Sequence, residues 1–215
     1  MSFYEHWVLP PLLDLVMRQR QLGKYRRDVV AGARGCVLEI GVGSGLNFAL
    51  YEEQVEVVIG LDPSERLLWM AQRRATKAGA PADLILGSAT NIPLENASVD
   101  TVVMTWTLCS ISDPLLALRE MRRVLKPGGA LLFVEHGLSP EPPVERWQQR
   151  LTPLWGHISG GCHLDRKVDD LIRAAGFEIS ILRNEYARGP RPMTYMYEGR
   201  ARPAISVSGG DERVP

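Results

Sequence analysis

Three glycines alternate with other residues directly after a short apolar run, and a carboxylate precedes them. The stretch reads Glu39-Ile-Gly41-Val-Gly43-Ser-Gly45. Because glycine has no side chain, alternate glycines let backbone N–H groups approach a ligand closely. A dinucleotide-binding turn instead has the spacing G-x-G-x-x-G, which brings a pyrophosphate to the N-terminus of the next helix. Glu39 would repel a phosphate and attract an ammonium group, so the turn favours a ligand with an amino group over a dinucleotide.

A second carboxylate, Asp62, ends the next apolar run, Val55 to Leu61. It lies roughly 20 residues beyond the glycine turn, where an acidic side chain can accept hydrogen bonds from both hydroxyls of an adenosine ribose. An aspartate before Pro63-Ser64 can also simply cap a helix. Taken alone, the position fits both uses.

Further short motifs follow in a fixed order along the chain. They are Gly60-Leu-Asp62-Pro-Ser64, Gly87-Ser-Ala89-Thr-Asn-Ile-Pro93, Ser98-Val-Asp100 and Leu125-Lys-Pro-Gly-Gly129. Together with the glycine turn, this set resembles the class I S-adenosylmethionine-dependent methyltransferases of the type 11 group, over about residues 35 to 135. The resemblance implies S-adenosylmethionine as the cofactor and methyl transfer as the reaction.

The resemblance also implies which residues bind the cofactor. They are Glu39, Gly41, Gly43 and Gly45 for the methionine part, Asp62 and Pro63 for the ribose, Ser88 and Ala89 for the adenine, and Thr105 near the reactive methyl group. Many relatives carry an acidic residue where Ser88 stands. Since a serine accepts a hydrogen bond from the adenine amino group more weakly, this is a departure from the family pattern.

A narrower resemblance concerns the methyl acceptor. It rests on Trp106 to Ser110, Val134 to His136, Trp147 to Gln149, Gly161 to Arg166 and Gly189 to Arg191. These segments resemble the methyltransferase-like proteins that methylate alkyl thiols, a group near the ubiquinone-type and phospholipid methyltransferases. The implied acceptor is a small apolar molecule: first a thiol, then a phospholipid amine or a quinol-type compound. The alternatives are a non-catalytic, cofactor-binding regulatory module and a nicotinamide-dependent oxidoreductase.

His136 is the candidate catalytic residue. It follows Glu135 at the end of an apolar run, beside the expected methyl group, where an imidazole could take the proton of an acceptor. A thiol with a pKa of about 8.5 is only a few per cent ionised near neutrality, so such a base would help. The alternative is a structural histidine that hydrogen-bonds the segment after it.

A group of histidines and a cysteine follows in the segment expected to cover the site. His157, Cys162 and His163 have no fourth ligand at a recognisable spacing, and the reaction needs no Lewis acid. We therefore expect no metal ion. The tryptophans of this segment, Trp147 and Trp155, would line an apolar acceptor pocket or pack the segment itself.

Alternating strands and helices must place these motifs together. Apolar runs predict strands at 36–40, 55–61, 84–86, 99–108, 130–135, 177–182 and 193–201, with helices between them, one of which begins at Leu46. The pattern predicts a single α/β domain: a doubly wound, Rossmann-like, seven-stranded, mostly parallel sheet with an antiparallel terminal strand. The ligand then lies at the carboxyl ends of the strands. We expect a helical cap over 1–34, a methyltransferase domain over 35–202 with a lid-like insertion at 137–166, and a disordered tail over 203–215.

Composition limits the partners and the compartment. Lysine and arginine total 25 of the 215 residues and aspartate and glutamate also total 25, so no net charge draws the protein to nucleic acid. Three scattered cysteines are typical of a reduced, cytoplasmic protein without disulfides. From the N-terminal residues we expect no signal sequence and, unlike in the animal thiol methyltransferases that the chain resembles, no hydrophobic anchor. We expect no transmembrane segment, and the sequence leaves peripheral membrane contact and the oligomeric state open.

Overall fold

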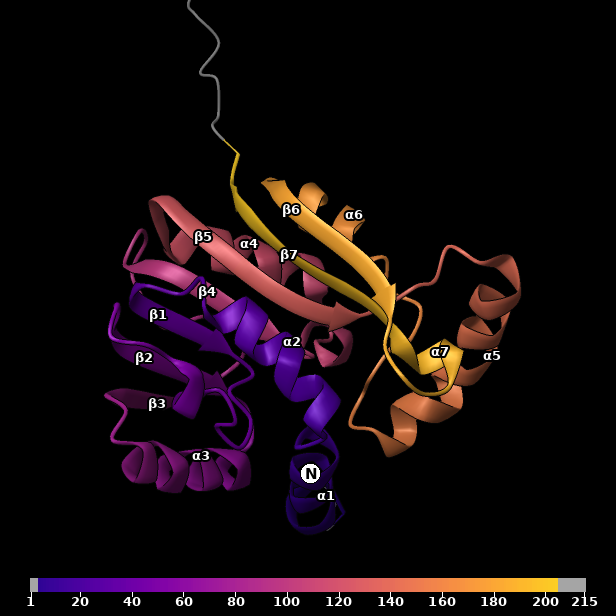
Figure 1. Ribbon diagram of the computed structural model, residues 1–215, viewed down its shortest axis with the longest axis horizontal. Helices are drawn as coiled ribbons and strands as arrows, with labels where there is room; N and C mark the ends of the chain where they lie inside the picture. Colours follow the sequence, from indigo (N-terminus) through magenta and orange to yellow (C-terminus); the bar gives the residue numbers. More distant parts are fainter. Residues whose placement is uncertain (1–3, 205–215) are drawn as a thin grey trace, which may run out of the picture.

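A computed structural model describes residues 4–204 (Figure 1). Seven strands form one sheet in the order β3-β2-β1-β4-β5-β7-β6. The first five strands are parallel, and β7 runs antiparallel to both β5 and β6. The strands are β1 (Gly35–Ile40), β2 (Val55–Asp62), β3 (Ala82–Leu86), β4 (Val99–Thr105), β5 (Leu125–His136), β6 (Phe177–Tyr186) and β7 (Tyr195–Pro203). The predicted mostly parallel sheet with an antiparallel terminal strand is confirmed.

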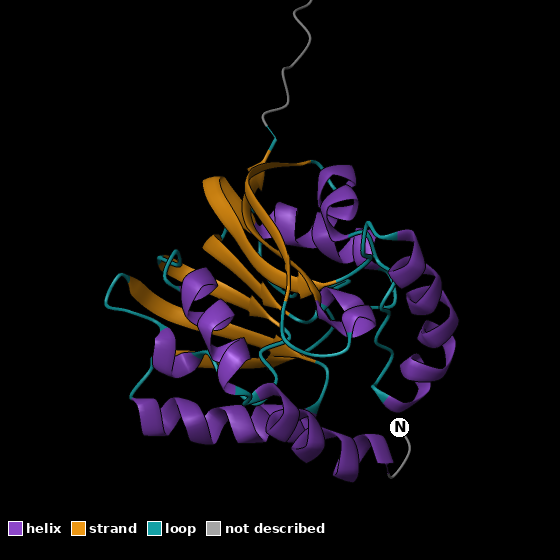
Figure 2. Ribbon diagram, turned by 45° about the vertical axis from the view of Figure 1, so that its right-hand side comes forward, coloured by secondary structure: helices purple, strands orange, loops and turns teal. Residues whose placement is uncertain are grey.

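Helices lie on both sides of this sheet (Figure 2). Along β4, Val102 and Met104 belong to one buried cluster and Val103 to the other, as expected of a strand covered on both faces. α4 and α6 supply the first cluster, and α2 and α3 supply the second. The helices are η1 (Tyr4–Val8), α1 (Leu9–Met17), α2 (Arg20–Val30), η2 (Phe48–Leu50), α3 (Glu65–Ala78), η3 (Leu108–Ser110), α4 (Pro114–Val124), α5 (Pro142–Ile158), α6 (Val168–Ala174) and α7 (Arg191–Thr194).

Two of the predicted elements are shorter than expected. The helix expected from Leu46 is only the turn η2, because Tyr51 already has an extended backbone, with φ −71° and ψ 135°. The fourth strand ends at Thr105 rather than at residue 108. Trp106 has a φ of 52°, a left-handed conformation that breaks a strand. The chain then turns into η3, which brings residues 105–112 across the carboxyl edge of the sheet.

The N-terminal helices and the segment after β5 meet beyond this edge. The Tyr4 hydroxyl donates a hydrogen bond to the carbonyl of Ile158 at the end of α5, at 2.8 Å. No helix within residues 4–204 is long and apolar enough to cross a lipid bilayer. β7 extends to Pro203 and the Ala204 N–H donates to the Gly176 carbonyl at 2.9 Å, so the predicted tail begins too early; its residues 205–215 lie outside the described residues.

Candidate active site

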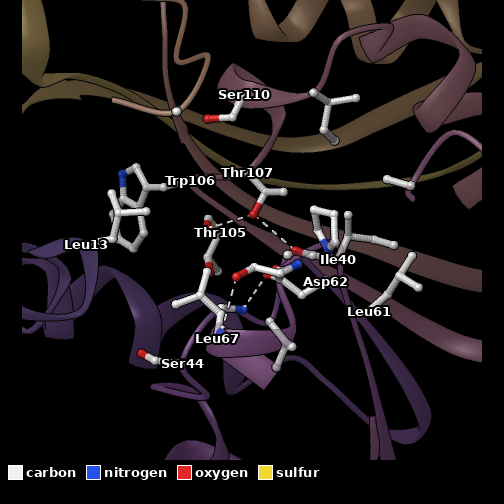
Figure 3. Close-up of a pocket in the computed structure, with 18 of the residues that line it drawn as sticks. Leu13, Ile40, Ser44, Leu61, Asp62, Leu67, Thr105, Trp106, Thr107 and Ser110 are labelled. Carbon is white, nitrogen blue, oxygen red and sulfur yellow. Dashed lines mark hydrogen bonds between the residues drawn. The ribbon is translucent and has the colours of Figure 1, made fainter. Parts of the chain in front are cut away.

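A cavity of about 510 Å³ opens at the carboxyl ends of β1, β2, β3 and β4, where the strand order predicts a ligand. Its walls come from α1, α2, the glycine turn, the end of β2, residues 87–89, residues 105–112 and the pair Ser159 and Gly160. In the view of Figure 3, the lining residues Asp62, Thr105 and Thr107 lie in the middle, and Leu13 and Trp106 lie together on the left. Chain segments far apart in the sequence thus enclose one space.

Two of the three glycines in the glycine turn line the cavity. Gly41 and Gly43 line the cavity and have φ values of 63° and 55°, which favour glycine. Gly45 is not among the lining residues. A Cβ on Gly45 would lie 2.6 Å from the Phe48 ring and 3.0 Å from the Ala71 Cα in α3. The third glycine therefore serves helix packing, in contrast to the expected ligand contact.

Asp62 lies at the floor of the cavity with its carboxylate partly engaged. Its Oδ1 accepts a hydrogen bond from the backbone N–H of Ser64 at 2.8 Å, and its Oδ2 accepts one from Gly43 at 3.0 Å. The residue is only 5% exposed, and this burial raises the pKa of Asp62 against the effect of the two hydrogen bonds. Since each carboxylate oxygen has two lone pairs, Asp62 can still accept two hydroxyl groups from a ligand.

The other residues expected to contact the cofactor lie in the cavity wall, and two of them have hydroxyl groups that already form hydrogen bonds. Pro63, Ser88, Ala89 and Thr105 all line the cavity. The Ser88 hydroxyl is paired with the Thr90 hydroxyl at 2.7 Å. The Thr105 hydroxyl accepts hydrogen bonds at 3.3 Å from the Arg26 guanidinium and from the Asn47 amide. Both hydroxyls are therefore already engaged by protein groups.

Glu39 does not line the cavity, in contrast to the expected contact with the ligand. Its carboxylate accepts hydrogen bonds from the Asn47 amide at 2.8 Å and from the Tyr51 hydroxyl at 2.7 Å, and the residue is 1% exposed. Asn47 in turn accepts a hydrogen bond from the Arg26 guanidinium at 3.0 Å. Because Tyr51 and Asn47 cover the carboxylate, Glu39 is a positioning residue that holds Arg26 in place through Asn47.

The burial of Glu39 predicts a pH-dependent stability. Burial raises the pKa of Glu39 from 4.5 to about 7, although hydrogen bonds from Tyr51 and Asn47 and the charge of Arg26 oppose the shift. Between these two values the folded protein holds a proton that the unfolded chain has lost, so the free energy of unfolding falls as the pH rises through this window. A shift of this size is worth about 3 kcal/mol.

This effect is measured by urea unfolding of the wild type and Glu39→Gln at pH values of about 5 and about 8. The wild type should lose stability relative to Glu39→Gln on going to the higher pH, by about 3 kcal/mol. The control Glu56→Gln, on the exposed side of β2, should follow the wild type at both values. A stability difference between wild type and Glu39→Gln that does not change with pH contradicts this interpretation.

Two charged residues of the cavity come from the N-terminal helices and were missed by the sequence analysis. Arg26 in α2 is 7% exposed, its guanidinium lies 4.9 Å from the centre of the Trp106 ring, and its Nε is buried without a partner among the described residues. Asp14 in α1 accepts a hydrogen bond from the Ser44 hydroxyl at 2.6 Å and pairs with Arg74 at 2.8 Å. Neither lies in a motif, so only the tertiary structure identifies them.

His136 does not line the cavity either, in contrast to its predicted place beside the methyl group. Its Nε2 faces the sulfur of Cys162 at 3.1 Å, behind the segment that forms the cavity wall. The neighbouring Glu135 carboxylate accepts the backbone N–H groups of Thr107 and Leu108 at 2.8 and 3.1 Å. The end of β5 therefore supports the wall of the cavity from behind.

Comparisons with known proteins bear on this site. The profile of the methyltransferase domain family matches residues 38–133. The human thiol S-methyltransferase TMT1B is 35% identical over 177 residues, which are 79% of this chain and 70% of that protein. This chain belongs to the S-adenosylmethionine-dependent methyltransferases. The cofactor of this family is S-adenosylmethionine.

Other methyltransferases match over different shares of the chain. The rat thiol S-methyltransferase TMT1B is 36% identical, and the match spans 67% of this chain but only 61% of the rat protein. The demethylmenaquinone methyltransferase of Paenarthrobacter aurescens is 31% identical over 66% of this chain and 56% of its own length. A solved methyltransferase from Thermotoga maritima, titled a possible histamine N-methyltransferase, has a TM-score of 0.63 at 25% identity and covers 89% of this chain and 93% of its own.

Proposed function

We propose that this methyltransferase transfers the methyl group of S-adenosylmethionine to a small alkyl thiol. The observation that carries the proposal is the mixed lining of the cavity. Asp62 and the glycine backbone supply polar groups, and apolar side chains of α1 and Trp106 supply an apolar side, where Leu13 and Trp106 lie together (Figure 3). Relatives named thiol S-methyltransferase make a thiol the first acceptor to test.

The described residues fit the cofactor. Asp62 offers free lone pairs to the two ribose hydroxyls, and no side chain separates Gly41 and Gly43 from the cavity. Arg26 lines the cavity, so its positive charge would attract a carboxylate bound there. The methionine carboxylate is such a group, which explains why a buried arginine is held in place through Asn47 and Glu39.

The acceptor would occupy the apolar part of the cavity. It is lined by Leu9, Leu13 and Met17 of α1, by Trp106 and Ile111, and by Ser159 and Gly160 after α5. These side chains exclude water, which favours an apolar acceptor and lowers the competition from hydrolysis. Trp106 keeps a left-handed backbone that is costly for a bulky residue, and such strain occurs preferentially at functional sites.

The chain's own contribution to the reaction is mainly alignment. When bound, the cofactor supplies a methyl group that its sulfonium already activates. Residues 105–107 and 110–112, which line the cavity, would orient the acceptor toward the bound cofactor, and such alignment can supply a large part of the acceleration of a bimolecular reaction. The two acidic residues of the lining are both engaged: Asp14 with Ser44 and Arg74, and Asp62 with backbone N–H groups.

We therefore expect the acceptor thiol to lose its proton to water, and the ionisation of the thiol itself to set the pH dependence. For two thiols of different pKa, the rise of kcat/KM with pH should level off at two different values, each near the pKa of the thiol used. Initial rates across a pH series with each thiol measure this. A common pH midpoint for both thiols would instead point to a protein base and would return that role to His136.

The experiment that tests the function measures transfer of a labelled methyl group from S-adenosylmethionine to a panel of acceptors. The panel contains alkyl thiols, a demethylated quinol and phosphatidylethanolamine, with S-adenosylhomocysteine as the inhibitor control. Thiol ether as the main product supports the proposal. A methylated quinol would favour the second candidate, which the similarity to a demethylmenaquinone methyltransferase suggests. Cofactor binding without transfer to any thiol would overturn the thiol assignment.

A further inference from the structure

Two cysteines and a histidine that lie far apart in the sequence meet behind the wall of the cavity. Cys109 belongs to η3, His136 ends β5, and Cys162 follows α5. The Nε2 of His136 lies 3.1 Å from the Sγ of Cys162. The ligand atoms of all three residues lie within 4.8 Å of one another. None of the three has a part in the mechanism proposed above.

We propose that Cys109, His136 and Cys162 bind a Zn²⁺ ion. Two sulfurs and an imidazole nitrogen form a donor set that zinc prefers. In a tetrahedral zinc site, bonds of about 2.3 Å to sulfur and about 2.0 Å to nitrogen place the donor atoms roughly 3.5 to 3.8 Å apart. The three donor atoms lie no more than 4.8 Å apart, and His136 Nε2 and Cys162 Sγ lie 3.1 Å apart, so both distances are close to this value. Small side-chain movements are enough to complete the triangle of ligands.

The surroundings of the sulfurs suit a divalent ion. Cys109 and Cys162 are 4% and 8% exposed, and they share a small apolar cluster with Leu164, Leu151, Trp155 and Met193. A thiolate without a partner is costly in such a place. Two thiolates balance the charge of Zn²⁺, so the complex of the ion with both sulfurs and a neutral imidazole carries no net charge. The fourth coordination position stays open to water or a small ligand.

The histidine ring supports the same assignment. Its Nδ1 is buried and has no hydrogen-bond partner within residues 4–204, while its Nε2 faces the Cys162 sulfur at 3.1 Å. With the proton on Nδ1, the Nε2 lone pair points to the sulfurs, as coordination of a metal ion through Nε2 requires.

The position of the cluster indicates what the ion would do. The backbone N–H of His163 donates to the Cys109 carbonyl at 2.9 Å, and the Arg166 guanidinium donates to the Leu108 carbonyl. These bonds already tie the segment after α5 to η3. An ion on Cys162 would add a tie to β5 and would hold Ser159 and Gly160, two residues of the cavity wall, in place.

The sequence predicted no metal ion, because His157, Cys162 and His163 have no fourth ligand at a recognisable spacing. In the structure His157 bonds through Nδ1 to the Pro153 carbonyl at 2.7 Å, and His163 Nδ1 lies 3.8 Å from the Asp165 carboxylate. Only Cys162 of that group reaches the cluster. Its partners, Cys109 and His136, are 53 and 26 residues away in the sequence.

The test uses the full chain, purified under a reducing agent, stripped with a chelator and reloaded with Zn²⁺ or Co²⁺. We expect an equimolar amount of bound zinc after desalting, measured by elemental analysis. We also expect the visible absorption bands of tetrahedral, thiolate-bound cobalt. Zinc should raise the melting temperature of the stripped protein, because an ion that binds only the folded state stabilises it.

Variants decide which residues hold the ion. Cys109→Ser and Cys162→Ser should each weaken zinc binding by at least roughly 100-fold and remove the sulfur-to-cobalt absorption. The matched control is Cys36→Ser, the third cysteine, which lies in β1 and should bind zinc like the wild type. No cobalt bands in a folded wild type, or zinc binding that survives both substitutions, would overturn the proposal. These readouts do not depend on methyl transfer, so they can fail while the proposed function holds.

Discussion

Asp62→Asn should lose cofactor binding by at least roughly 100-fold, which corresponds to about 3 kcal/mol. The carboxylate accepts one backbone N–H on each oxygen, from Ser64 and Gly43. An asparagine has only one oxygen, so its amino group must face one of these donors. The substitution also removes one of the two acceptors proposed for the ribose hydroxyls. Hydrogen bonds to charged groups are worth about 1.5–3 kcal/mol each, so the loss of the charged acceptor for the ribose hydroxyls reaches the expected size, while the mismatch with the backbone donors mainly lowers stability.

Titration calorimetry with S-adenosylhomocysteine measures this loss without depending on the acceptor. Asp83→Asn, at an exposed position of the neighbouring strand β3, is the control for the removal of one negative charge and should bind like the wild type. Circular dichroism must show that Asp62→Asn is folded. If a folded Asp62→Asn binds the inhibitor within about threefold of the wild type, less than 1 kcal/mol, the carboxylate does not hold the ribose.

The sequence predicted the sheet and its ligand edge because both follow from short-range patterns. Apolar runs separated by amphipathic segments define the strands, and the glycines and Asp62 stand directly after two of them. Residues at the carboxyl ends of parallel strands come together whatever their distance in the sequence. The cavity therefore contains Gly41, Gly43, Asp62 and Thr105, as expected.

The remainder of the site depends on contacts between segments that no pattern connects. Arg26 and Asp14 reach the cavity only because α1 and α2 fold back over the edge of the sheet. Glu39 follows the strand pattern, but Asn47 and Tyr51 determine where its carboxylate goes. The imidazole of His136 likewise contacts Cys162, a residue of the segment after α5. Sequence spacing located the ends of the strands, while the directions of these side chains came from tertiary packing.

The glycine turn offers a test in which backbone strain and steric overlap are separated. Gly41 and Gly79 both have a φ of 63°. A Cβ on Gly79, which caps the C-terminus of α3, meets nothing within 4 Å, whereas a Cβ on Gly41 would overlap the Thr107 side chain. Gly79→Ala should therefore cost only the left-handed conformation, about 1–2 kcal/mol. Gly41→Ala bears this strain and the overlap, so its cost should exceed about 3 kcal/mol.

The cofactor affinity should separate the two variants even more clearly than stability does. Thr107 donates a hydrogen bond to the Ile40 carbonyl at 3.1 Å, so an alanine at Gly41 must displace either this residue or the turn itself. Both movements change the cavity wall, and Gly41→Ala should lose binding of S-adenosylhomocysteine by roughly 100-fold or more. Gly79→Ala, which lies outside the cavity lining, should keep wild-type affinity. Equal urea midpoints and equal affinities for the two variants would show that the turn tolerates a side chain. The inference that its backbone approaches the ligand closely would then be wrong.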